Sequence, residues 1–129
     1  MTADIFTLCD FAQESDGKLT VVGAFDTIYA RRFPAMHPSM CLAVRLRFFI
    51  HEAGRHTIRI TFTAPDGVEP VKAIDGETSV QDFSGSSRVV HSVFTLLNTP
   101  IEREGTMGIT LTVDGRELLT SPLYAKKVT

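Results

Sequence analysis

The sequence predicts an all-β domain, specifically an antiparallel two-layer β-sandwich of the immunoglobulin-like kind. Apolar and polar residues alternate with period two, helical periodicity is almost absent, and turn signals separate the segments at regular spacing. A pattern of about seven to nine short strands without linker or repeat is typical of a sandwich. A small closed β-barrel is the alternative, and it would enclose a ligand instead of a packed core.

The clearest predicted strands cover residues 40–50 and 55–64, joined by a short hairpin loop at 51–54. In both segments every second residue is large and apolar, so one face of each strand should be buried. The predicted core of the domain consists of Leu42, Val44, Leu46, Phe48, Ile58, Ile60, Phe62, Val93, Ile109, Leu111 and Val113.

The C-terminal region predicts a hairpin. Residues 106–113 alternate, Asp114-Gly115 is a strong two-residue turn signal, and the return strand covers about 116–126. Pro122 indicates an edge or a bulge in that strand. The segment Phe33–Pro38 contains two prolines and is predicted to be a loop. Weaker strands are predicted at 3–11, 18–25, 26–33, 71–82 and 87–98.

Length and charge set limits on the class of protein. The chain has 129 residues, 13 Lys and Arg, 15 Asp and Glu, and a formal net charge of -2, which suits one domain over residues 1–129. This balance argues against nucleic-acid binding through bulk charge. The N-terminal segment lacks the basic region of a secretory signal, and no apolar run matches a membrane helix. We therefore expect a cytoplasmic protein that does not bind membranes.

No motif for catalysis or for a cofactor is present in the sequence. There is no GxSxG, no GxxxxGK[ST] and no GxGxxG, so we expect neither an enzyme nor a bound cofactor. Cys9 and Cys41 make no CxxC, and we interpret them as reduced, small apolar packing residues. A disulfide between them is the alternative.

We expect no metal site, and the candidates for one are weak. His51 and His56 flank the predicted loop at 51–54, and Glu52 lies between them. Two imidazoles and a carboxylate would form a partial site if the loop brought them together. The simpler interpretation is a set of polar residues near a loop.

The charges are segregated along the chain. Residues 31–59 contain six arginines and one acidic residue, whereas residues 66–82 contain five acidic residues and one lysine. Arg45, Arg47 and Arg59 all have outward parity on their predicted strands. If those strands pair, the three arginines and Phe49 would form one exposed patch suited to binding a protein. The alternative is a solvated face whose charges are balanced by acidic residues of a neighbouring strand.

Several segments resemble a known family. They are GKLTVVGAFD (17–26), FPAMHP (33–38), APDG (64–67) and EGTMGITLTVDGRELLTSPLYAKK (104–127). Together they resemble a family of small bacterial proteins of unknown function, over nearly the whole chain. The resemblance implies a single-domain, cytoplasmic, β-rich protein and no catalytic residues.

Taken together, the sequence favours a non-enzymatic module for protein interaction or self-association. Such a module would act through the face of Arg45, Arg47, Arg59 and Phe49, or through an exposed edge strand. The partner would be another protein or a second copy of the chain, and one aromatic residue beside the arginines is too few for stacking single-stranded nucleic acid. A small-molecule or metal site at one loop end is the alternative.

Overall fold

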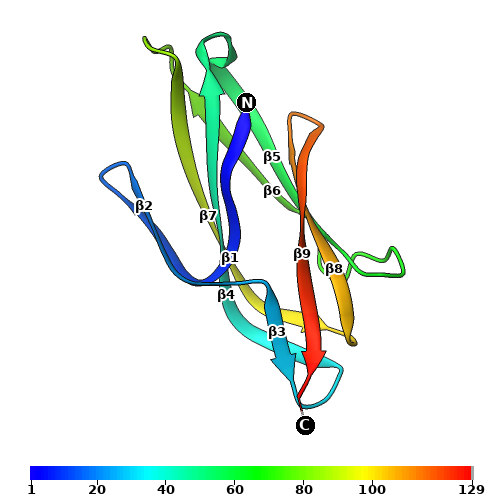
Figure 1. Ribbon diagram of the computed structural model, residues 1–129. Helices are drawn as coiled ribbons and strands as arrows, with labels where there is room; N and C mark the ends of the chain where they lie inside the picture. The colour runs from blue at the N-terminus through cyan, green and yellow to red at the C-terminus, as the bar shows by residue number, and fades with distance from the viewer. Residues whose placement is uncertain (129) are drawn as a thin grey trace.

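The computed structural model describes residues 1–128, which form two β-sheets packed face to face (Figure 1). The first sheet has the strand order β2-β1-β4-β7, and the second sheet has the order β3-β9-β8-β5-β6. The predicted two-layer sandwich is therefore confirmed. The first sheet contains β1 (Thr2–Ser15), β2 (Lys18–Phe25), β4 (Ala35–Phe49) and β7 (Ser87–Ile101); the second contains β3 (Thr27–Ala30), β5 (Gly54–Thr63), β6 (Ile74–Val80), β8 (Gly105–Val113) and β9 (Arg116–Lys127).

Two local predictions were wrong. The short strand β3 runs parallel to β9, so the domain is not purely antiparallel. The segment predicted as a loop at Phe33–Pro38 belongs largely to a strand, because β4 already begins at Ala35. The start of β4 pairs with the end of β7, from Ala35↔Ile101 onward. This long-range pairing outweighs the local preference of the two prolines.

Alternation identified the core residues correctly in ten of eleven cases. Those on β4, β5 and β8 are all buried in one cluster between the sheets. Val93 is the exception, because its partner on β4 is Ala43, which faces away from that cluster. Val93 instead packs partly buried in a second, smaller cluster on the outer face of the first sheet.

The strands β4 and β5 do not form a hairpin, contrary to expectation. A single 3₁₀ turn at Ile50–Glu52 carries the chain from the first sheet into the second, where β5 pairs with β6 and β8. The apolar faces of β4 and β5 thus meet across the sandwich rather than side by side. A short polar loop is compatible with either arrangement, so the sequence alone did not distinguish them.

The hairpin of β1 and β2 bends sharply away from the line of the first sheet (Figure 1). Its residues Ala12, Leu19 and Val21 pack in the second cluster with Cys9, Cys41, Ala43 and Val93. Cys41 and Ala43 point outward from the sheet, yet both are buried. The hairpin therefore covers part of the outer face of the first sheet.

Gly23 makes this bend sterically feasible. It lies within β2 with a φ of 68°, and a Cβ atom there would collide with the side chain of Asp10. We expect Gly23→Ala to lower the free energy of unfolding by at least about 1–2 kcal/mol, measured by urea denaturation. Gly76→Ala is the matched control on β6, since a Cβ there would meet Phe94 at an ordinary 3.5 Å. A Gly23→Ala protein as stable as the Gly76→Ala protein would contradict this account.

Candidate functional site

Arg45 and Arg47 lie on the outer face of the first sheet, beside Asp4 of β1. The Arg47 guanidinium donates to the Asp4 carboxylate through Nε at 2.9 Å, and its Nη1 donates to Ser87 Oγ at 2.7 Å. Arg45 Nε is 3.8 Å from the same carboxylate. The hydrogen bond from Arg47 holds the pKa of Asp4 below its ordinary value. A single carboxylate therefore faces both arginines, and Arg45 Nε, which is buried, has no hydrogen-bond partner within residues 1–128.

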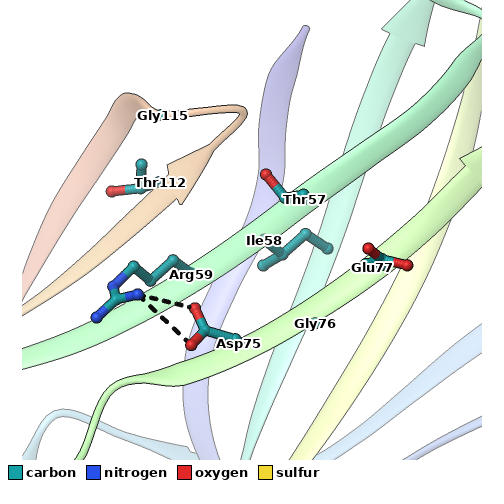
Figure 2. Close-up of a pocket in the computed structure, with 8 residues that line it drawn as sticks. All are labelled: Thr57, Ile58, Arg59, Asp75, Gly76, Glu77, Thr112 and Gly115. Atoms are coloured by element: carbon teal, nitrogen blue, oxygen red, sulfur yellow. Dashed lines mark hydrogen bonds and ion pairs between the residues drawn. The ribbon is translucent and has the colours of Figure 1, made fainter.

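Arg59 lies on the other side of the sandwich, on the outer face of the second sheet. Its Nη1 donates to the Asp75 carboxylate of β6 at 3.2 Å, as Figure 2 shows. The two residues line a shallow groove of about 630 Å³. Arg55 and Glu77 form a looser pair at 4.0 Å on the same two strands.

The single arginine patch is thus a wrong prediction. Arg45 and Arg47 are on β4 and Arg59 is on β5, and these strands belong to different sheets. Arg59 instead faces Asp75 of the neighbouring strand β6, and Arg45 and Arg47 face Asp4 of the neighbouring strand β1, as in the alternative weighed from the sequence. Phe49 is exposed at the end of β4, where its backbone N–H donates to Glu52. A role for these four residues in binding a protein remains a prediction.

The three weak metal candidates do not converge. His51 is exposed, and the Glu52 carboxylate accepts from the Phe49 N–H at 2.8 Å and contacts the Met1 amino group at 2.9 Å. Both nitrogens of His56 contact other groups. Across residues 1–128, no group of three or more His, Cys, Asp or Glu side chains has the arrangement of a metal site.

His56 is instead buried and contacts Asp114 and Glu52 through its two ring nitrogens. Its Nδ1 lies 2.5 Å from Asp114 Oδ2, and its Nε2 lies 2.6 Å from the Glu52 carbonyl oxygen. Its ring stacks on Phe48 with centroids 4.5 Å apart. Both facing oxygens are hydrogen-bond acceptors, so both ring nitrogens can donate only when the imidazole is protonated.

The charges around His56 agree with that protonation state. Burial alone would lower the pKa of His56, but the hydrogen bonds and charges of Asp114 and Glu52 outweigh burial and raise it above 6.5. Burial would likewise raise the pKa of Asp114, whereas His56 and the Thr57 N–H lower it below 3.8. The sequence indicated Asp114 only as a turn residue. Its spacing from His56 contains no signal of their contact.

A second hollow lies at one loop end of the sandwich. It has a volume of about 340 Å³ and is lined by the loop after β5 and the turn between β7 and β8. The lining is mostly apolar and includes Pro65, Val68 and Met107. At the rim of this pocket, Arg103 Nη2 donates a hydrogen bond to Asp66 Oδ2 at 2.5 Å. Sequence reasoning missed this pocket, because the two segments are distant along the chain.

The edges of the first sheet are β2 and β7. The outer side of β7 has no strand partner within residues 1–128, although the strand is 15 residues long. Its register with β4 runs without a bulge from Phe49↔Ser87 to Ala35↔Ile101. Leu97 on β7 is 67% exposed.

Within residues 1–128, no helix is long and apolar enough to cross a membrane.

These features define a two-sheet β-sandwich domain with charge pairs between neighbouring strands and a long free strand edge. The chain belongs to the family of unknown function DUF6941, whose model matches residues 4–126. This membership confirms the resemblance to a family of unknown function. No curated protein and no solved structure shows a significant match to the chain.

Proposed function

We propose that the protein is a non-enzymatic self-association module in which two copies pair along β7. The observation that carries this proposal is the free edge of a 15-residue strand. An unpaired edge presents a row of N–H and C=O groups that can bond to another strand. Antiparallel pairing about a two-fold axis would join the first sheets of two copies into one continuous sheet.

The composition of β7 supports pairing. Arg88 is its one side chain with a permanent charge, and valine, leucine and phenylalanine make up six of its 15 residues. Residues with strong β-propensity and few charges favour addition of a strand. Asn98 has a φ of 52° and Pro100 lacks an N–H, so the pairing segment is residues 87–97.

The other edges have features that oppose pairing. The strand β3 has four residues. The strand β2 is interrupted by Gly23 at positive φ and belongs to the bent hairpin. The strand β6 has seven residues and carries the charged side chains of Asp75 and Glu77. Short, bent and charged edges are common protections against edge pairing.

Light scattering at low and high salt tests the proposal. We expect a dimer whose mass does not change with salt, because backbone hydrogen bonds between strands are screened far less than surface charges. Thr95→Lys with Leu97→Lys should convert the dimer to a monomer by placing like charges on the paired edge. The matched control is Thr20→Lys with Val22→Lys, the same substitutions on the exposed residues of β2.

Three results would count against β7 pairing. A wild-type monomer at high protein concentration would refute self-association. Dissociation at high salt would indicate charge-driven contacts between the basic and acidic segments instead. Loss of the dimer in the β2 variant, with the β7 variant still dimeric, would assign the interface to the opposite edge.

The loop-end pocket supports a second candidate function, binding of a small apolar molecule. Its volume and mostly apolar lining are within the range of small-molecule sites. Benzyl alcohol is a suitable probe, followed through the methyl resonance of Met107, which lines the pocket. That resonance should shift, while the methyl of Met40, fully buried between the sheets, should not. Equal responses of the two methyls would remove this candidate.

A further inference from the structure

Cys9 and Cys41 lie directly opposite each other on β1 and β4. Directly opposed residues of an antiparallel pair have Cα atoms about 4.5–5.5 Å apart, within the span that a disulfide bridges. Both thiols are free, and Cys9 Sγ is 3.6 Å from the carbonyl oxygen of Cys41. Cys41 Sγ lies 3.9 Å from Thr95 Oγ1, so rotation about one side-chain bond is needed to face Cys9.

The distal part of the β1–β2 hairpin, which begins beyond Cys9 itself, covers the two thiols. Cys9 is 0% exposed and Cys41 is 7% exposed, and both pack with Ala12 of the hairpin. Burial and the neighbouring Cys41 raise the pKa of the Cys9 thiol, which keeps it protonated and slow to react while covered. An oxidant can therefore reach the two thiols only when the hairpin moves away from the sheet.

Within residues 1–128, one contact between a carboxylate and a histidine joins the tip of the hairpin to β7. Glu14 Oε2 is 3.4 Å from His91 Nδ1, and the Glu14 side chain is half-exposed. The hairpin otherwise rests on the small cluster of Ala12, Leu19 and Val21, which buries little apolar area compared with the main core. Elements with few buried contacts open more often than the rest of a fold.

We infer that Cys9 and Cys41 form a reversible dithiol–disulfide site that reacts with small-molecule disulfides such as oxidised glutathione. The thiolate of Cys41, the more exposed residue, attacks one glutathione sulfur and releases a glutathione thiolate. The thiolate of Cys9 then attacks the Cys41 sulfur and releases the second. Two protein S–H bonds are lost, one S–S bond forms, and oxidised glutathione is reduced to two glutathione molecules. The inference does not require the proposed self-association, although His91 lies in the proposed pairing segment.

The test is to incubate the folded protein in glutathione buffers of increasing oxidation and to measure intact mass and melting temperature. We expect the intact mass to fall by two hydrogens and the oligomeric state to stay the same. The melting temperature should rise by several degrees, because the bond constrains the unfolded chain. Reduced glutathione should reverse the change in intact mass and the rise in melting temperature. Cys9→Ala and Cys41→Ala should each give at most a glutathione adduct, with no rise in melting temperature.

A further variant tests whether the β1–β2 hairpin protects the two thiols from oxidation. Glu14→Ala removes the side chain that contacts His91 and should speed disulfide formation severalfold in the same buffer. The matched control is Gln13→Asn, at the exposed neighbouring position, which should leave the rate unchanged. Two results would overturn the inference: both thiols remaining free in the folded protein while the urea-unfolded chain oxidises, or a disulfide that forms only between chains.

Discussion

Replacing Ile60 with Ala is expected to lower the free energy of unfolding by about 2–5 kcal/mol. Ile60 is fully buried on β5, between the two sheets. Truncating it removes buried apolar surface and leaves a cavity that tightly packed neighbours fill only in part. Leu46→Ala makes the equivalent change on β4, in the opposite sheet, and should cost a similar amount.

Urea denaturation measures both losses, and the chain contains a matched control. Ile50 is 51% exposed in the 3₁₀ turn, away from the proposed pairing strand. Ile50→Ala makes the same chemical change at the surface and should stay within about 0.5 kcal/mol of the wild type. Losses below about 1 kcal/mol at both core positions would mean that the inward faces are assigned wrongly.

Asp114→Asn is expected to lower the free energy of unfolding by about 1–2 kcal/mol near pH 6. The substitution removes the charge that faces the protonated His56, but an asparagine still tolerates the φ of 53° at this turn position. A hydrogen bond between charged groups contributes about 1.5–3 kcal/mol when well shielded. The Asp114 side chain is 39% exposed, so solvent screening reduces that contribution.

The effect should depend on pH in a defined direction. The pKa of His56 is raised above 6.5 by folding, so its stabilisation is complete below pH 6.5 and is lost as the pH rises through the folded-state value. The pKa of Asp114 is lowered below 3.8, so its contribution is present above pH 3.8 and is lost in acid. The difference between wild type and Asp114→Asn should therefore be largest between these two values.

Urea unfolding at several pH values tests this prediction, with Asp16→Asn as the control. Asp16 occupies the equivalent position in an Asp-Gly turn, also with a φ of 53°. Within residues 1–128 it forms no hydrogen bond or ion pair with a histidine, so its substitution should change stability by no more than about 0.5 kcal/mol at any of these pH values. If Asp114→Asn lowered the free energy of unfolding by the same amount at pH 6 and at strongly alkaline pH, this result would contradict a protonated His56.

Local sequence was sufficient to predict the type of fold and most of the core. The alternation over residues 40–50 assigned each side chain to a face, because successive residues of a strand point to opposite sides. The Asp114-Gly115 turn was predicted for a similar reason, since few residue pairs adopt positive φ so readily. Both properties depend on neighbours along the chain and are readable without a structure.

The sites depended on which strands pair, and the sequence did not contain that information. Alternation states that Arg47 and Arg59 face outward, but not that they face outward from different sheets. The contact of His56 with Asp114 and the opposition of Cys9 and Cys41 arise from the register of distant segments. Register is selected by how the two apolar faces pack as a whole, so only the tertiary structure decides which polar and thiol groups meet.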